Sequence, residues 1–329
     1  MGSKETVVIC VHGANQEDKT EAENHRVWSQ ALELEKESRQ VRGVLSGENN
    51  EEISEYHIKK HIGCEFPQYV GWTSAWYGGV WQRLKKLPKS NRFSGILNPS
   101  QDGEVDERRY LLDIIERTAM RNHFDELVPF YELAVCNDTG KTLYEEVCRK
   151  VLDQIIVATE NGSKDYILIG HSMGCAVTYN VLSHMSKIAE GEDPVDIPSA
   201  LSSEYLDKLS QFISKPGKPF GLLTFGNYIG YNWSQKANTR LLYGERKRHY
   251  VYPDIIPRWY NFYTILGGDP YILDDKMEDT IISDEKDGYE DVRVWRVPPF
   301  NIGHGRHAWF RRDSFSKQLL KKLKWHIYR

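Results

Sequence analysis

The chain has 329 residues, of which 40% are hydrophobic and 27% charged, and it carries a formal net charge of −4. This composition is sufficient for a core and excludes a compositionally disordered chain. The near-neutral charge excludes a global field that would attract nucleic acid, so we expect no nucleic-acid partner. No apolar run approaches the roughly 20 residues that cross a bilayer, and residues 6–11 lack the flanks of a signal peptide.

The cysteine pattern indicates neither disulfides nor a metal site. Five cysteines are widely spaced along the chain, and none belongs to a C-x-x-C pair. Such spacing gives no signal for a disulfide framework or for zinc binding. We therefore expect reduced thiols in a cytoplasmic protein, with no metal and no cofactor.

The first half of the chain is predicted to begin with a buried strand and to carry a long insertion. The predicted elements are a strand at 6–11, a helix at 20–37, a strand at 69–72 and a helix at 104–127. Residues 73–99, rich in Trp, Gly and Lys, resemble no regular element. We interpret residues 41–140 as a cap-like insertion that shapes substrate binding.

The second half alternates strands with helices. Thr142 and Glu145 form a capping-box pattern that starts a helix, and Asn161-Gly162 ends it. A helix with an apolar stripe follows the strand at 166–170. Further strands are predicted at 220–225, 259–266 and 292–297, and a last helix at 315–325. This alternation predicts the α/β class with a doubly wound, mostly parallel sheet.

The most informative motif is Gly170-His171-Ser172-Met173-Gly174, which lies between a predicted strand and a predicted helix. A G-x-S-x-G pattern in this setting is typical of a nucleophile elbow, a sharp turn that presents an exposed serine hydroxyl. The serine then lies at the N-terminus of a helix, where the dipole and the free amides favour a developing negative charge. The motif therefore predicts Ser172 as a nucleophile.

Together with other landmarks, this motif resembles the α/β-hydrolase superfamily, and within it the lipase/esterase branch. The landmarks are Val11-His12-Gly13, Thr224-Phe225-Gly226, Asn261-Phe262-Tyr263, Gly268-Asp269-Pro270 and a C-terminal histidine. The resemblance implies an α/β-hydrolase fold in which residues 1–329 form a single domain. It also implies a catalytic triad in the chain order Ser, acid, His.

The resemblance also implies roles for individual residues. Ser172 would be the nucleophile, and the backbone amides of Ala14 and Met173 would form the oxyanion hole. Asp269 is the favoured acid because it follows an apolar run and precedes a proline. Asp254, which lies in a second Asp-containing turn, remains the alternative.

Two histidines compete for the role of general base. His304 and His307 share the loop after the last predicted strand, whereas His326 falls within the terminal helix. We favour His307, because Phe310 and Asp313 follow it at distances similar to those after the family's histidine. His304 remains the alternative.

These residues predict a serine esterase that cleaves carboxylic esters, including lipid esters, through an acyl-enzyme. The partner would be a small-molecule or lipid ester. An acyltransferase or thioesterase would use the same residues, and a catalytically silent hydrolase fold could serve as a binding module. These alternatives remain open at this stage.

Two basic stretches could contact a membrane. One contains Arg83, Lys85, Lys86, Lys89 and Arg92, and the other contains Lys317, Lys321, Lys322 and Lys324. If the two are adjacent in space, they could bind an anionic membrane surface. Most such charge runs are solvated faces.

Overall fold

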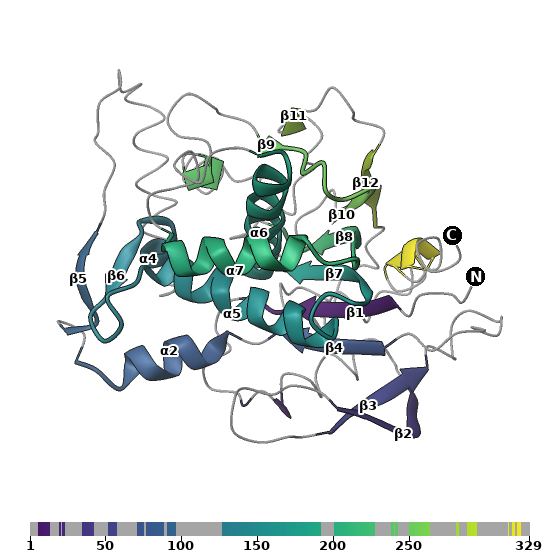
Figure 1. The fold of residues 1–329 in the computed structure, drawn as a ribbon, viewed down its shortest axis with the longest axis horizontal. Coiled ribbons are helices and arrows are strands. Elements are labelled where there is room, and N and C mark those ends of the chain that lie inside the picture. The colour runs from purple at the N-terminus through teal and green to yellow at the C-terminus, as the bar shows by residue number, and fades with distance from the viewer. Residues whose placement is uncertain are drawn as a thin grey trace, which may run out of the picture.

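The computed structural model describes the strands and helices that form the body of the molecule (Figure 1). The described residues are 6–13, 20, 22–23, 35–42, 52–57, 71–75, 77–88, 91–96, 127–191, 201–227, 238–239, 241–242, 250–263, 281–282, 288–294, 315, 318–319 and 321–323. None of the helices in these ranges is long and apolar enough to cross a membrane.

A six-stranded sheet forms the centre, in the order β12-β10-β8-β7-β1-β4. Its strands are β1 (Thr6–Val11), β4 (Gly71–Ala75), β7 (Asp165–His171), β8 (Pro219–Phe225), β10 (Trp259–Tyr263) and β12 (Tyr289–Arg293). Every neighbouring pair is parallel. All residues of β1 and β7 are buried, which explains their continuous apolar sequence. The predicted α/β class with a parallel sheet is confirmed.

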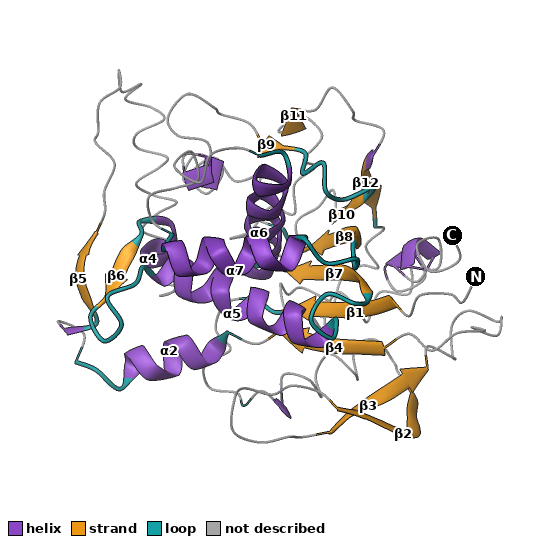
Figure 2. Cartoon of the chain, viewed as in Figure 1, coloured by secondary structure: helices purple, strands orange, loops and turns teal. Residues whose placement is uncertain are grey.

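Several helices lie together against one face of this sheet (Figure 2), and the described residues of the C-terminal helix pack on the other. Val7, Ile9 and Val11 of β1 pack on the face covered by α5 (Leu143–Ala158), α6 (Met173–Ala189) and α7 (Ser203–Ile213). The intervening Val8 and Cys10 belong to the opposite face. There they share a cluster with Phe315, Leu319 and Leu323 of the C-terminal helix. The alternation of side chains along each strand therefore supplies two separate apolar layers.

The helix predicted after Thr142 is confirmed as α5. The side chain of Thr142 accepts a hydrogen bond from the amide of Glu145 at 3.1 Å, as the capping pattern predicts. Asn161 and Gly162, both with positive φ, follow the end of the helix. The positions with four-residue spacing are all fully buried: Leu143, Val147, Val151 and Ile155.

The sequence predictions for the polar N-terminal region are partly wrong. Thr20 and Glu23 exchange capping hydrogen bonds, as expected for a helix start. However, β2 (Glu35–Arg42) begins inside the predicted helix 20–37 and pairs antiparallel with β3 (Glu52–His57). This hairpin lacks a period-2 apolar pattern, so the sequence contained no strand signal for it.

The segment predicted as a cap-like insertion, 41–140, includes one strand of the central sheet among its described residues. β4 joins the central sheet beside β1. The predicted irregular region contains α2 (Gly78–Lys85) and β5 (Phe93–Ile96), which pairs with β6 (Ala134–Cys136). Val80, Trp81 and Leu84 of α2 are buried in the main core, and this burial compensates for the poor helix propensity of its two glycines.

Other elements differ from the prediction in place or were missed. Pro129 lies in the first turn of α4 (Leu127–Tyr131), where a missing amide proton costs little. β12 begins three residues before the predicted strand 292–297. Three further elements had not been predicted: α7, β9 (Tyr250–Val251) and its parallel partner β11 (Ile281–Ile282).

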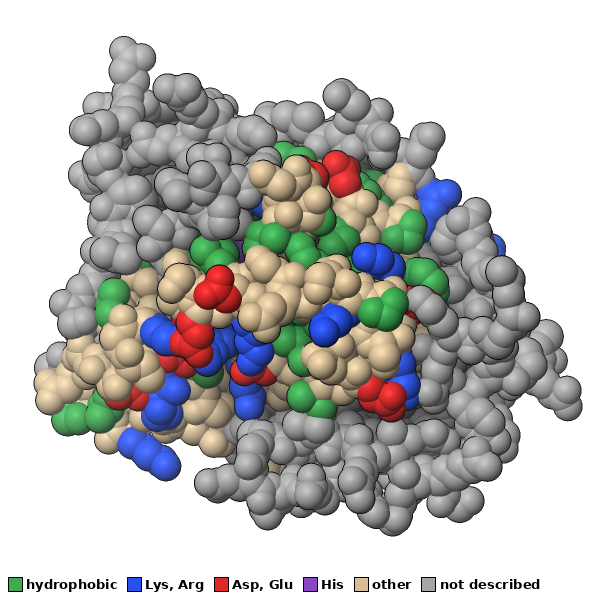
Figure 3. All heavy atoms as spheres, viewed as in Figure 1, with side chains coloured by type: hydrophobic (Ala, Val, Ile, Leu, Met, Phe, Trp, Pro, Cys, Tyr) green, Lys and Arg blue, Asp and Glu red, His purple; other side chains and the backbone are tan. Residues whose placement is uncertain are grey.

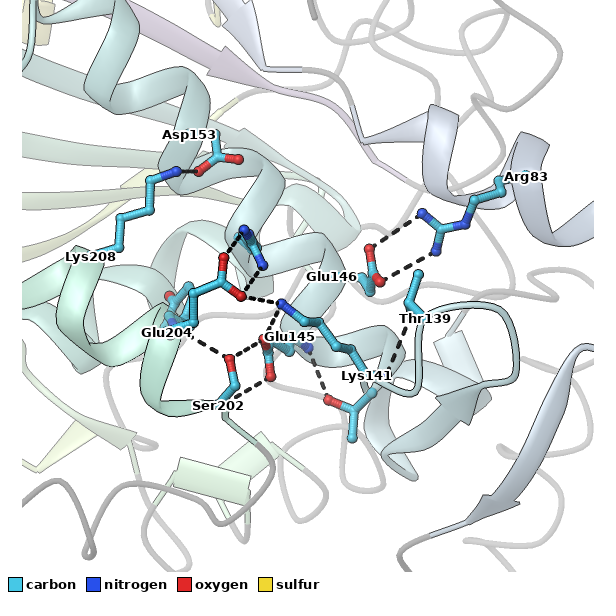
Figure 4. A network of polar contacts seen from close by, with 12 residues as sticks. Arg83, Thr139, Lys141, Glu145, Glu146, Asp153, Ser202, Glu204 and Lys208 are labelled. Carbon is cyan, nitrogen blue, oxygen red and sulfur yellow. Dashed lines mark hydrogen bonds and ion pairs between the residues drawn. The ribbon is translucent and has the colours of Figure 1, made fainter. Parts of the chain in front are cut away.

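Charged side chains join α5 to α7 (Figure 4). Glu145, only 2% exposed, accepts hydrogen bonds from the amide and hydroxyl of Ser202, the N-cap of α7, at 2.8 and 2.6 Å. Hydrogen bonds from Lys141 and Arg149 lower the pKa of Glu204 to about 2. Figure 3 shows acidic and basic side chains intermixed on this face. This mixture offers no single-sign patch over the two helices.

The described residues of the two basic stretches belong to elements that pack on different faces of the sheet. α2, which carries Arg83, packs into the core on the α6 side, whereas the C-terminal helix packs on the other side. Arg83 forms ion pairs with Asp138 and Glu146. Lys322 pairs with Glu290.

A buried histidine predicts how stability depends on pH. His184 on α6 hydrogen-bonds to the hydroxyls of Tyr144 (2.9 Å) and Tyr205 (3.2 Å). Burial lowers the pKa of His184 to about 3 from its ordinary value of 6.5. The unfolded chain therefore takes up this proton first as the pH falls below 6.5, so folding stability decreases from there toward pH 3.

We expect this histidine to cost about 2 kcal/mol of unfolding free energy between pH 7 and pH 5, at about 1.4 kcal/mol per pH unit. Urea unfolding at the two pH values measures the loss. The His184→Gln variant keeps a hydrogen-bonding side chain without this titration, so its loss should be smaller by that amount. An identical loss in both proteins would contradict the assignment.

Candidate active site

Ser172 occupies a strained backbone conformation at the junction of β7 and α6. Its φ of 56° and ψ of −125° lie in a region that residues with a side chain rarely adopt. The other described non-glycine residues with positive φ are Leu133, Glu160 and Asn161. Such strain costs of order 1–3 kcal/mol and persists only where the surrounding structure enforces it.

The two glycines of the motif are required sterically. A Cβ on Gly170 would lie 2.8 Å from the Cα of Cys175, in the first turn of α6. A Cβ on Gly174 would lie 2.4 Å from the carbonyl oxygen of Val11 and 2.5 Å from that of His12. The helix α6 therefore starts in direct contact with the end of β1, and only glycine permits this approach.

The loop after β1 also lies against the serine. A Cβ on Gly13 would be 2.6 Å from the Cβ of Ser172 and 3.1 Å from its Oγ. Ser172 is only 3% exposed, whereas the motif had predicted an exposed hydroxyl. The close approach of Gly13 is one physical reason for this difference. The backbone at Gly13 is thus a neighbour of the Ser172 hydroxyl.

The turn at Ser172 is also attached to β8. The amide of Ser172 donates a hydrogen bond to the carbonyl of Phe225 at 3.2 Å, and the thiol of Cys175 donates to the same oxygen at 3.4 Å. Met173 is the first residue of α6. Because the first amides of a helix have no acceptor within it, the Met173 amide is placed where an anion can be bound.

His12 and Tyr77 form a buried pair beside this turn. The amide of Tyr77 donates to Nε2 of His12 at 3.0 Å, and the Tyr77 hydroxyl donates to the His12 carbonyl at 2.9 Å. The two rings stack with centroids 4.0 Å apart. Nδ1 of His12 contacts the carbonyl oxygen of Gly13. His12 therefore has a structural position in the loop, and Tyr77 is a partner that the sequence analysis had not identified.

A row of polar side chains crosses three neighbouring strands near the same edge of the sheet. Thr224, Asn261 and Asp291 occupy paired positions on β8, β10 and β12, and Thr224 pairs in turn with Gly170. Asn261 accepts from the hydroxyl of Thr224 at 2.9 Å and donates to Asp291 at 2.8 Å. The side-chain amide of Asn227 also donates to the side-chain oxygen of Asn261, at 3.2 Å. This row holds together the strands that lead to the predicted acid and base.

We expect Asn261→Asp to destabilise the fold by about 2 kcal/mol at pH 8. The change removes the donor to Asp291 and places a second carboxylate beside it. One of the two must then stay protonated in the folded state, which raises its folded pKa, so the extra stability loss grows as the pH rises above about 4, the reference pKa of an aspartate in the unfolded chain. Urea unfolding at pH 5 and pH 8 measures this trend.

Asn227→Asp is the matched control for this variant. The side-chain amide of Asn227 donates to Asn261 rather than to a carboxylate. The control should therefore show a weaker pH dependence. Equal unfolding free energies for Asn261→Asp and the wild type at pH 8 would argue against the polar row.

Four of the sequence-predicted site residues lie outside the described residues: Ala14, Asp269, His304 and His307. Ser172 and Met173 lie together at the junction of β7 and α6. The alternative acid, Asp254, is exposed and precedes β10. Because β7 and β10 are parallel members of one sheet, Asp254 precedes the amino end of its strand, whereas Ser172 follows the carboxyl end of β7.

The described part of the chain contains neither an exposed thiol nor a grouped set of metal ligands. The thiols of Cys10, Cys136, Cys148 and Cys175 are buried. Burial raises the pKa of Cys136 to about 12 and also raises that of Cys148, which keeps both protonated at neutral pH. Within the described ranges, no three His, Cys, Asp or Glu residues are grouped to hold a metal ion.

No protein-family model, curated protein or solved structure matches this chain. The site is therefore interpreted from its own residues and geometry.

Proposed function

We propose that this protein is a serine hydrolase with an α/β-hydrolase fold that cleaves carboxylic esters, lipid esters among them. The observation that carries the proposal is the backbone of Ser172. Its strained φ and ψ, between two glycines that tolerate no Cβ, match the geometry that a nucleophile elbow requires. A strained residue enforced by close packing at the end of a parallel strand points to function.

The sheet topology supports the order of the proposed triad. In a parallel sheet, the segments that follow the strands leave from the same edge. Gly13 follows β1, Ser172 follows β7, and Asp269 lies in the chain after β10. His304 and His307 lie in the chain after β12. The same argument favours Asp269 over Asp254, since Asp254 precedes its strand.

In the proposed mechanism, His307 takes the proton of the Ser172 hydroxyl as Oγ attacks the ester carbonyl carbon, and Asp269 holds the imidazole in the required tautomer. The amides of Met173 and Ala14 stabilise the oxyanion of the tetrahedral intermediate. The protonated histidine then gives its proton to the departing alcohol. Water, activated by the same histidine, cleaves the acyl-enzyme and restores the serine.

Labelling with a fluorophosphonate probe tests the proposed nucleophile. Phosphonylation of a serine requires both an activated hydroxyl and access to it, so the experiment also tests access to a side chain that is only 3% exposed. We expect stoichiometric labelling of the wild type, with the adduct located on Ser172 by peptide mass spectrometry. Ser163, which hydrogen-bonds to a backbone carbonyl through its own hydroxyl, is the internal control and should remain unlabelled.

Absence of labelling in folded wild-type protein, together with no hydrolysis of short p-nitrophenyl esters, would contradict the proposed function. In that case the chain would be a catalytically silent member of this architecture. Labelling without ester hydrolysis would favour acyl transfer or thioester cleavage on the same serine.

A further inference from the structure

The His12 ring has only one tautomer that fits its contacts. A backbone amide can only donate a hydrogen bond, so Nε2 of His12 accepts from Tyr77 and carries no proton. The proton of the neutral ring is therefore on Nδ1, where it is donated to the carbonyl oxygen of Gly13. The Tyr77 amide thus fixes the ring proton of His12 on Nδ1, the nitrogen that donates to the Gly13 carbonyl.

Holding this carbonyl also orients the next amide. A peptide group is planar and trans, so its C=O and N–H point in opposite directions. The peptide that begins with the Gly13 carbonyl ends with the amide proposed as one arm of the oxyanion hole. Since Gly13 lies against the Cβ and Oγ of Ser172, a rotation of this peptide would change the geometry around the reactive oxygen.

The Tyr77 hydroxyl restrains the same region from the other side. It donates to the His12 carbonyl, and that carbonyl oxygen is one of the two atoms against which Gly174 packs. Tyr77 is fully buried, and it follows β4, whose Ala75 pairs with Val11 at the end of β1. One residue therefore fixes both the loop at Gly13 and the contact between β1 and α6.

We propose that Tyr77 and His12 are positioning residues that orient the peptide after Gly13 for oxyanion stabilisation. This inference rests on the proposed hydrolase function. Neither side chain transfers a proton or contacts the ester. Their role is to hold a backbone donor in the geometry that the transition state requires, so their loss should affect kcat more than KM.

The first test is Tyr77→Phe, which removes the hydrogen bond to the His12 carbonyl and keeps the ring and the backbone amide. Complete loss of an oxyanion donor costs about 10²–10³ in kcat. We expect a partial loss here, a fall of about 10-fold in kcat for a p-nitrophenyl ester, with KM changed by less than about 2-fold.

Tyr179→Phe is the matched control. Tyr179 on α6 is also fully buried, and its hydroxyl donates to the backbone carbonyl of Val251 at 2.7 Å and accepts from the backbone amide of the same residue at 3.1 Å. Tyr179→Phe loses the same kind of donated hydrogen bond and one accepted bond besides, at a place where the proposal assigns no role in orientation. Its kcat should equal that of the wild type even where its stability is reduced as much as in Tyr77→Phe.

The second test compares two substitutions of His12. The amide nitrogen of His12→Asn can donate to the Gly13 carbonyl as Nδ1 does, whereas the side-chain oxygen of His12→Gln can accept from the Tyr77 amide as Nε2 does. We expect His12→Asn to retain several-fold more kcat than His12→Gln. A role in packing alone predicts that activity follows unfolding free energy, without this order.

The outcomes distinguish this inference from the function on which it rests. If the wild type shows no hydrolysis that depends on Ser172, the proposed function and the positioning role both fail. If the wild type hydrolyses esters and Tyr77→Phe and His12→Gln keep its kcat, the function stands and the positioning role is overturned. Should Tyr77→Phe fail to fold, the order of the two His12 variants decides.

Discussion

Replacement of Ser172 by alanine is expected to abolish ester hydrolysis while the protein stays folded. In the proposed mechanism this serine provides the attacking oxygen, so its removal should lower kcat by about 10⁴-fold or more. Only the hydroxyl is lost, and the Cβ remains in place against Gly13. Hydrolysis of short p-nitrophenyl esters measures the activity, and circular dichroism measures the fold.

Ser172→Gly separates the chemistry from the backbone strain at the same position. Glycine adopts a φ of 56° without a steric penalty, whereas alanine has a Cβ and therefore retains the penalty. Both variants should be inactive. The glycine variant should nevertheless be more stable than the alanine variant by about 1 kcal/mol, the relieved strain less the entropy cost of glycine.

Two results would contradict this account. Turnover in Ser172→Ala equal to that of the wild type would exclude Ser172 as the nucleophile. Equal unfolding free energies for the alanine and glycine variants would show that the backbone at this position stores no strain.

The parts of the fold that could be predicted are those whose burial produces a regular local pattern of apolar residues in the sequence. β1, β7 and β8 are buried on both faces, so each reads as a continuous apolar run. The hairpin of β2 and β3 and the strand β12 are polar in sequence, and their pairing depends on chain segments elsewhere. Burial of Trp81 in the main core similarly stabilises α2, and no local signal reports it.

The same division applies to the candidate site. Gly170, Ser172 and Gly174 lie within five residues of chain, so their spacing can be recognised in the sequence, although Gly174 is required by its contact with the end of β1. Tyr77 meets His12 across 65 residues of chain, and Asn261 meets Asp291 across 30. These contacts follow from the order of strands in the sheet. A single sequence does not encode that order locally, and for this reason these two contacts were not predicted.

Gly174→Ala is expected to produce the largest loss of stability among the substitutions considered. Its Cβ would lie 2.4 and 2.5 Å from the carbonyl oxygens of Val11 and His12, atoms that belong to or follow the central strand β1. Contacts this short force α6 away from the sheet. Overpacking typically costs 1–3 kcal/mol and occasionally more. With backbone on both sides unable to yield, we expect about 3–4 kcal/mol, measured by urea unfolding.

Gly140→Ala provides the control for this substitution. Gly140 has a positive φ of 70°, but a Cβ there would meet no atom within 4 Å. Its cost should be limited to the backbone conformation, about 1 kcal/mol. Ester hydrolysis should be unchanged in Gly140→Ala and lost in any folded Gly174→Ala, since a shift of α6 also moves the Met173 amide. Equal stability losses in the two variants would mean that α6 can start without this contact, and the steric explanation of the G-x-S-x-G spacing would then be wrong.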